Sequence, residues 1–301
     1  MANNVFGAIE AGGTKFVCAI GTNSGSIIHS IRIPTRAPAE TMADVIAFFQ
    51  NCGRPISAFG IGSFGPIDLN PASSTYGFIT STPKESWRNF DLAGTIRRAF
   101  NLPVAFDTDV NAAILGESQW GAAQGLETAL YVTVGTGIGG GAIVTGKPLH
   151  GLVHPEMGHI RIPHDFAHDP FPGLCPYHGD CLEGLASGPA IKARWGIAAS
   201  ELPADHTAFN LEADYLASAC VNWICTLSPQ RLILGGGVMQ PHIFPLLRER
   251  TRSLLNDYVN APEITERIDH YIVPPALGNQ AGVLGGLALA ISAMEKADYR
   301  T

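Results

Sequence analysis

Apolar residues occur along this chain in short runs that glycine-rich or polar turns interrupt. Three such runs, at 5–10, 16–21 and 27–33, are separated by turns too short to hold a helix, which predicts a three-stranded antiparallel meander. At 39–51 the apolar residues recur at helical spacing, which predicts a helix. The same two patterns predict strands at 56–62, 104–107 and 231–234, helices at 92–100, 111–120 and 243–256, and an irregular lobe at 66–86.

The plan of the first strands recurs after residue 126. A strand at 129–134, a glycine turn at 135–141, a strand at 142–145 and a tight turn at 146–147 repeat the order at the amino terminus. The length of 301 residues also indicates two domains, at roughly 150 residues each. We therefore predict an α/β fold with two domains of one design and mixed sheets. The predicted boundaries are 1–120 for the N-terminal domain, joined by a terminal helix at 279–301, and 121–278 for the C-terminal domain.

Composition narrows the classes of partner and location. The formal charge of −7 and the pI of about 5.8 argue against a protein that binds nucleic acid. No basic segment precedes the first apolar run, so we expect no signal peptide. The uncharged stretch at 279–294 is shorter than the ~20 apolar residues of a membrane span and fits a buried helix better. Six scattered cysteines indicate a reducing, cytoplasmic setting rather than a disulfide scaffold.

Two glycine turns, at 12–13 and from 135 onward, lie at equivalent points of the repeated plan. Glycine allows positive φ and lets an anion approach backbone amides, so this pair predicts a phosphate cradle. The spacing Gly135-x-Gly137-x-x-Gly140 also fits the dinucleotide fingerprint, but a β-branched run follows where that motif requires a helix. A third cluster, 235–237, joins a predicted strand to a predicted helix and is either a nucleotide contact or an ordinary tight connection.

The segments 10–15, 135–139 and 234–237 resemble the first phosphate, second phosphate and adenosine segments of the sugar kinase, hexokinase and actin superfamily. More narrowly, the whole chain resembles the ROK family of bacterial sugar kinases, and within it the fructokinases. The resemblance implies two ribonuclease-H-like domains around a central cleft, ATP and Mg²⁺ as cofactors, a hexose substrate and a homodimer. It implies that Glu10, where many ROK kinases have aspartate, reaches the magnesium shell directly or through water. The residues that it implies for ATP are Gly12, Gly13, Thr14, Lys15, Thr136, Gly137, Pro189, Gly235, Gly236 and Gly237.

Phosphoryl transfer to an alcohol needs a carboxylate that takes the hydroxyl proton. Asp107 and Asp109 lie where a predicted strand ends and a predicted helix begins, which places each at the functional edge of an α/β sheet or, alternatively, as a helix N-cap. The resemblance assigns the base to Asp109 and places Thr108 where these kinases have a sugar-binding asparagine. It also places Gly65 on the sugar side, in a turn that loop packing would equally explain.

His159, Cys175, His178 and Cys181 supply ligands that zinc prefers, three of them in a C-x-x-H-x-x-C spacing. Six of the ten histidines lie between 150 and 178, so coincidence in a histidine-rich loop is an alternative. The resemblance implies a structural Zn²⁺ here, in a loop at 159–181, because ROK proteins hold zinc in the corresponding place. Fixing this loop would also fix the carboxylates of two glutamates, which with His159 are predicted to bind sugar hydroxyls and are otherwise surface charge. These glutamates are Glu156 and Glu183.

The sequence therefore predicts a cytoplasmic, ATP-dependent hexose kinase that transfers the γ-phosphoryl group to the 6-hydroxyl of its sugar, with fructose as that sugar. Mannose, glucose and an N-acetylhexosamine are the rival substrates. A ROK transcriptional repressor is a rival of another class, but the first hairpin begins at residue 5, so we expect no DNA-binding module before it. A sugar-binding ROK protein without turnover is the remaining alternative.

Overall fold

The computed structural model describes residues 4–298, which form two compact units. The first unit contains residues 4–125, 148–155 and 279–298, and the second contains 126–147 and 156–278. Each unit is built around a five-stranded sheet.

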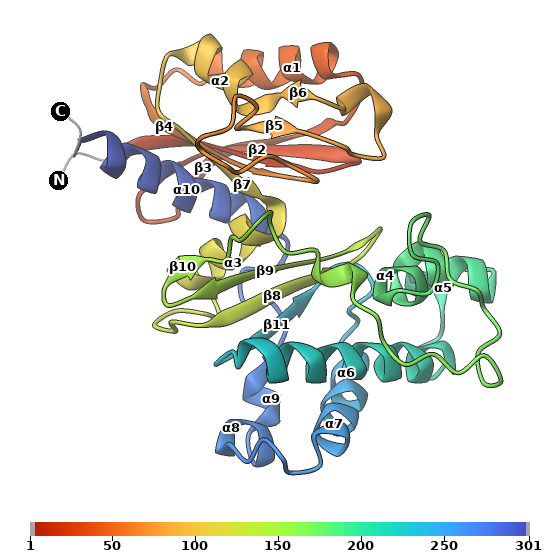
Figure 1. Ribbon diagram of the computed structural model, residues 1–301. Coiled ribbons are helices and arrows are strands. Elements are labelled where there is room, and N and C mark those ends of the chain that lie inside the picture. Colours follow the sequence, from red (N-terminus) through yellow and green to blue (C-terminus); the bar gives the residue numbers. More distant parts are fainter. Residues whose placement is uncertain (1–3, 299–301) are drawn as a thin grey trace. The chain divides into compact units, whose positions relative to one another are not determined.

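The sheet of the first unit combines an antiparallel meander with two parallel strands (Figure 1). Its strands are β1 (Val5–Ala11), β2 (Lys15–Thr22), β3 (Ile27–Pro34), β4 (Ile56–Ser63) and β7 (Val104–Thr108). Their order is β3-β2-β1-β4-β7. β1 pairs antiparallel with β2 and parallel with β4, and β4 pairs parallel with β7.

Helices cover both faces of this sheet, with α1 and α2 on one face and α3 and α10 on the other (Figure 1). Their bounds are α1 (Pro38–Gln50), α2 (Leu92–Phe100), α3 (Asp109–Trp120) and α10 (Ala281–Asp298). Between β4 and α2 lie β5 (Phe78–Ile79), η1 (Glu85–Trp87) and β6 (Phe90–Asp91), and η4 (Gly278–Gln280) precedes α10.

Aromatic side chains fill the core between the sheet and the first two helices. Phe49 of α1 makes an edge-to-face contact with Phe59 of β4, with ring centroids 5.0 Å apart. Trp87 is fully buried against Phe16, and its indole N–H donates to the carbonyl of Arg36 at 2.9 Å. Because the only polar atom of its side chain is bonded to backbone, Trp87 has a packing role.

On the opposite face, α10 approaches the sheet and α3 through small residues. A Cβ on Gly60 of β4 would lie 2.0 Å from the carbonyl oxygen of Gly286, and a Cβ on Gly285 would lie 1.7 Å from that of Ala112 in α3. Backbone contacts this close leave no room for any side chain, so glycine at these positions sets the depth to which α10 packs. The uncharged stretch predicted as a buried helix is therefore confirmed as one, and its glycines are packing residues.

The second unit repeats the sheet of the first, in the order β10-β9-β8-β11-β12. Its strands are β8 (Ala129–Val134), β9 (Ile138–Val144), β10 (Lys147–Pro148), β11 (Leu232–Gly235) and β12 (Ile272–Val273). Its helices are η2 (Met157–His159), α4 (Leu182–Ala186), α5 (Gly188–Trp195), η3 (Ala199–Glu201), α6 (Ala208–Leu227), α7 (Ile243–Leu255), α8 (Pro262–Thr265) and α9 (Ile268–Tyr271). The matching strand order confirms the predicted α/β fold with two mixed sheets of one design.

One prediction about this repeat was wrong. The second glycine turn ends at Gly137 and not at Gly141, since β9 begins at Ile138. The glycines of β9 serve packing instead, because a Cβ on Gly140 would lie 2.8 Å from the side chain of Met157. Among the residues described here, none of the helices has the length and apolar character needed to cross a membrane.

The close packing of α10 yields the first testable prediction. Gly285→Ala should lower the free energy of unfolding by roughly 1–3 kcal/mol, because the new methyl group meets a backbone carbonyl that moves only if α3 moves. That loss corresponds to a fall in Tm of several degrees, measurable by differential scanning calorimetry. Ser292→Ala, at a half-buried position of the same helix, is the matched control and should leave Tm within about 1 °C. A Gly285→Ala protein as stable as the control would contradict the packing argument.

Candidate functional site

Parallel pairing brings the carboxyl ends of three strands to one edge of the first sheet. In the register of β1 with β4, Glu10 lies opposite Gly62, and in that of β4 with β7, Gly62 lies opposite Asp107. The glycine turn after β1 and the segment at Asp107–Asp109 therefore meet at the same edge. This edge is where open α/β sheets place their functional groups.

The first glycine turn, residues 12–15, has a shape fixed by backbone bonds. The N–H of Gly12 donates to the carbonyl of Lys15 at 3.0 Å, and the hydroxyl of Thr35 donates to the carbonyl of Gly12 at 2.7 Å. A Cβ on Gly12 would lie 2.7 Å from the carbonyl oxygen of Lys15, so only glycine fits there. A Cβ on Gly13 would lie 3.6 Å from the side chain of Lys84, so Lys84 is a second cation near the turn besides Lys15.

Glu10 is a largely buried carboxylate at the end of β1. Its Oε2 has no hydrogen-bond partner among the described residues. Burial raises the pKa of Glu10, and the charges of Lys15 and Arg32 oppose that shift in part. A buried carboxylate oxygen without a proton donor matches the oxygen ligands that Mg²⁺ prefers, directly or through water. The side chain also lies against α10, where a Cβ on Gly282 would come within 2.5 Å of it.

The junction between β7 and α3 holds Asp107, Thr108 and Asp109. The hydroxyl of Thr108 accepts from the N–H of Asn111 at 3.1 Å, so Thr108 is the N-cap of α3. The alternative that either aspartate caps the helix was wrong, because α3 begins at Asp109 itself. Oδ1 of Asp109 accepts from the N–H of Val110 at 2.9 Å. Threonine caps helices nearly as well as aspartate does, so the sequence contained this signal.

Two histidines near this edge, His150 and His154, were not among the site residues predicted from the sequence. Nε2 of His150 lies 2.9 Å from Oδ2 of Asp107, and this bond raises the pKa of His150. Nε2 of His154 accepts from the N–H of Ile67 at 3.1 Å, beside Gly65. Both contacts join segments far apart in sequence, within the first unit. The unusual density of histidines at 150–178 was the one available signal.

In the second unit, three predicted nucleotide segments come together. The N–H of Gly135 donates to the carbonyl of Gly137 at 2.9 Å, and the carbonyl of Gly135 accepts from the N–H of Gly188 at 2.8 Å. The turn that contains Thr136 is thereby joined to the first turn of α5, where Pro189 is the second residue.

The third segment is the turn after β11. Gly236 has φ of +97°, and a Cβ on it would lie 2.3 Å from the carbonyl oxygen of Val134 at the end of β8. The position therefore requires glycine both for its backbone conformation and for the close approach. The 135–137 turn, the start of α5 and the 235–237 turn thus lie together, and the backbone amides that their own hydrogen bonds leave unused suit an anion or a nucleotide edge.

His159, Cys175, His178 and Cys181 form one cluster, and their ligand atoms all lie within 4.8 Å of one another. Nδ1 of His159 lies 3.7 Å from Sγ of Cys175 and 3.5 Å from that of Cys181, and Nδ1 of His178 lies 3.5 Å from Sγ of Cys175. A tetrahedral Zn²⁺ with Zn–S and Zn–N bonds of about 2.3 and 2.0 Å would separate S and N ligands by roughly 3.5 Å. The donor set and its spacing thus fit zinc.

Glu183 links this cluster to the second glycine turn. Its Oε2 accepts from the N–H of Ile138 at 2.9 Å, and its Oε1 lies 3.9 Å from Nε2 of His159. His159 therefore presents Nδ1 to the thiols and Nε2 to a carboxylate, an arrangement that orients metal-binding histidines in many proteins. The N–H of His159 donates to the carbonyl of Glu156 at 3.0 Å, so both predicted sugar-binding glutamates lie beside the cluster.

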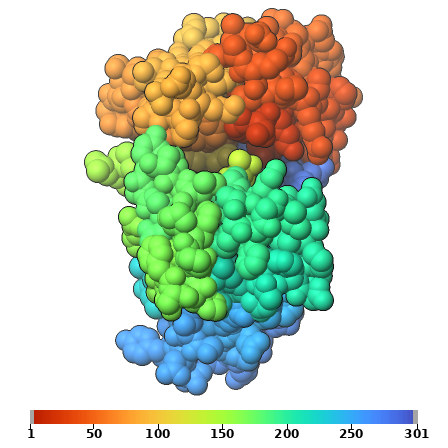
Figure 2. All heavy atoms as spheres, turned by 90° about the vertical axis from the view of Figure 1, so that its right-hand side faces the viewer, coloured from red at the N-terminus to blue at the C-terminus, as the bar shows by residue number. Residues whose placement is uncertain are grey.

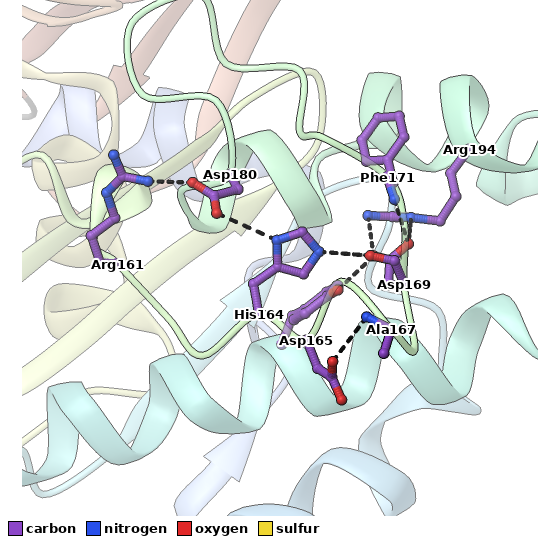
Figure 3. Close-up of polar contacts among 9 residues, drawn as sticks. Arg161, His164, Asp165, Ala167, Asp169, Phe171, Asp180 and Arg194 are labelled. Carbon is purple, nitrogen blue, oxygen red and sulfur yellow. Dashed lines mark hydrogen bonds and ion pairs between the residues drawn. The ribbon is translucent and has the colours of Figure 1, made fainter.

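A polar network holds the loop at 159–181 onto the second unit (Figure 3). The ring of His164 lies between Asp180 and Asp169, with its Nδ1 3.4 Å from Oδ2 of Asp180 and its Nε2 3.0 Å from the carbonyl oxygen of Asp169. The buried Asp169 carboxylate pairs with Arg194 of α5 and accepts from the hydroxyl of Tyr215 of α6 at 2.5 Å. Burial opposes ionisation of Asp169, but these contacts together hold its pKa below the ordinary value.

The same network borders two neighbouring cavities on the second unit, of about 500 and 690 Å³. Figure 2 shows the loop, in green, at the surface of that unit beside the blue-green α5 region. None of the residues predicted from sequence to bind ATP, sugar or metal lines either cavity. The network therefore has a role in loop attachment and adds nothing to the predicted chemistry.

Comparison with known proteins shows which proteins this chain is similar to. A sequence model of the ROK family matches residues 6–293. A fructokinase of Pediococcus pentosaceus is 46% identical over 294 residues, which cover 97% of this chain and 100% of that protein. A fructokinase of Zymomonas mobilis is 45% identical over 302 residues, covering 97% and 98%. The solved structure of a ROK family glucokinase from Streptomyces griseus, in complex with glucose and AMPPNP, matches with a TM-score of 0.69 at 25% identity, covering 96% and 100%.

Proposed function

The chain belongs to the ROK family, and from that membership we propose that it is an ATP-dependent fructokinase that phosphorylates the 6-hydroxyl of fructose. The observation that carries the choice of sugar is the 45–46% identity, over almost the whole of both chains, to two proteins named fructokinases. The complex of the Streptomyces griseus relative with AMPPNP supports ATP as the phosphoryl donor. A homodimer and a cytoplasmic location stay predictions.

Asp109 is the residue that we assign as the base. It lies at the first position of α3, at the same sheet edge as the first glycine turn and Glu10. Its carboxylate would take the proton of the sugar hydroxyl while that oxygen forms a bond to the γ-phosphorus and the bond from phosphorus to the bridging oxygen of ADP breaks.

The binding residues follow from the same edge and from the second unit. The turns at 12–14 and 135–137 would hold phosphate oxygens through the backbone amides that their own hydrogen bonds leave unused, and Gly235, Gly236 and Gly237 would line the nucleoside. Glu10 would hold Mg²⁺, which when bound neutralises charge on the phosphates. For the sugar we assign Gly65, Thr108, Glu156, His159 and Glu183.

A steady-state assay across sugars tests the substrate. With ATP saturating, kcat/KM for fructose should exceed that for mannose, glucose and N-acetylglucosamine by at least about 10-fold. A preference for one of the other sugars would change the proposed substrate but not the proposed type of reaction. Sugar binding by calorimetry without any turnover would instead support the non-enzymatic alternative and contradict the proposal.

Asp109→Asn should lower kcat by about 10²–10⁴-fold, because the amide cannot take the hydroxyl proton. The dissociation constant for ATP should change less than about twofold, since the predicted nucleotide contacts come from other residues. Asp44→Asn, at an exposed position of α1, is the isosteric control and should retain wild-type turnover. A nearly unchanged kcat in Asp109→Asn would move the base to another residue.

The four-residue cluster should hold a structural zinc, since four protein ligands leave no open coordination position. We expect about one zinc per chain by elemental analysis, and loss of that zinc in Cys175→Ala. At a free zinc concentration 100 times the dissociation constant the bound ion contributes about 2.7 kcal/mol, so Tm should fall by roughly 5–10 °C in that variant.

Cys225→Ala, which changes an exposed cysteine, is the control and should keep both zinc and Tm. Purified wild-type protein without zinc, together with an unchanged Tm in Cys175→Ala, would remove the structural role.

A further inference from the structure

The segment 148–155, which we call the strap, packs with the first unit although the chain on both sides of it belongs to the second. Its two histidines attach it at separate places. His154 is buried and accepts from the N–H of Ile67, in the turn that follows Gly65. His150 binds Asp107, two residues before the proposed base Asp109.

Asp107 is a structural anchor and not a second base. It is only 3% exposed, and Oδ1 accepts from the N–H of Thr108 and from Nδ2 of Asn111, both at 2.8 Å. Oδ2 is occupied by Nε2 of His150 at 2.9 Å. Three donors surround the carboxylate and fix its position, and because a carboxylate oxygen accepts, the imidazole nitrogen that faces it is the donor.

His150 is thus held in place through its Nε2, and the rest of its side chain is accessible to solvent. Its side chain is 43% exposed, and within residues 4–298 its Nδ1 has no hydrogen-bond partner. Thr108, between the two aspartates, already uses its hydroxyl oxygen to accept from the helix backbone. Nδ1 of His150 is therefore a fixed polar atom of the first unit close to the edge where Asp109 and Gly65 lie.

We propose that His150 is a specificity-determining residue of the sugar subsite, that its Nδ1 forms a hydrogen bond with a hydroxyl of the acceptor sugar, and that Asp107 is the residue that positions its ring. This inference rests on the proposed sugar kinase function. The competing explanation is a latch, in which the Asp107–His150 bond only fastens the strap.

Two isosteric substitutions separate the explanations. Asparagine places its amide where Nδ1 of histidine lies, whereas glutamine places its amide where Nε2 lies. If Nδ1 contacts the sugar, KM for fructose should rise about fivefold or more in His150→Gln, and less in His150→Asn, which keeps the contact to the sugar but loses the bond to Asp107. The value of kcat and the KM for ATP should stay within about twofold in both. His270→Gln, an exposed histidine of α9, is the matched control.

The role of Asp107 is tested by a double-mutant cycle. Asp107→Asn alone should raise KM for fructose, but in the His150→Gln background it should add less than about twofold, because its effect on the sugar passes through the ring. Additive effects on KM would show that Asp107 acts elsewhere. Tm is measured for every variant, since the latch predicts that His150→Asn, which loses the contact to Asp107, is the more impaired in both Tm and KM.

Two results overturn the inference: a KM for fructose in His150→Gln within about twofold of wild type, or a larger rise in His150→Asn than in His150→Gln. Both arise with a wild-type enzyme that phosphorylates fructose, so they leave the proposed function intact. If wild type prefers another hexose, the same comparison is made with that hexose. A wild-type protein that neither phosphorylates nor binds any of the sugars, by assay and by calorimetry, overturns both proposals.

Discussion

The parallel register of β1, β4 and β7 determines where every candidate group of the first unit lies. Glu10, Gly62 and Asp107 occupy one row across three strands, so the residues that follow each strand meet at one edge. A shift of one residue would turn each side chain to the opposite face of the sheet. Hydrophobic burial sets this register, because Ile9, Ile61 and Phe106 in the neighbouring row are all buried. The packing that buries these side chains therefore also fixes which residues lie at the candidate site.

Much of the fold and of the candidate site could be predicted from the sequence where the signal comes from neighbouring residues. The strands of the first hairpin, the helix at 39–51 and the glycine turn at 12–15 depend on neighbouring residues, and the structure has them close to where the pattern indicates. In the second hairpin the strand after the turn begins at Ile138 and not at residue 142. The four candidate metal ligands could be recognised in the sequence because three of them lie within seven residues. Glycine was harder to interpret, since Gly12 is needed for a turn and Gly140 for packing, and both stand in similar glycine-rich strings.

Contacts between distant segments could not be predicted in this way. Asp107 and His150 are 43 residues apart, and only the pairing of β7 and the course of the strap bring them together. The choice of Thr108 over Asp107 or Asp109 as the helix cap depends on the phase of α3 to within one residue, which composition does not determine. A side-chain network attaches the loop at 159–181 to α5 and α6, and the cluster that fits zinc joins the two ends of the loop to each other.

The final helix adds a consequence for the order in which the chain is made. The first unit contains residues 4–125, yet its sheet is covered on one face by α10, the last helix that the structure describes. During synthesis from the amino terminus, every residue of the second unit leaves the ribosome before α10 does. The second unit can thus complete its core while β1 and β4 still have one apolar face uncovered. The second unit, although most of it follows the first in the sequence, is therefore the first of the two that can fold completely.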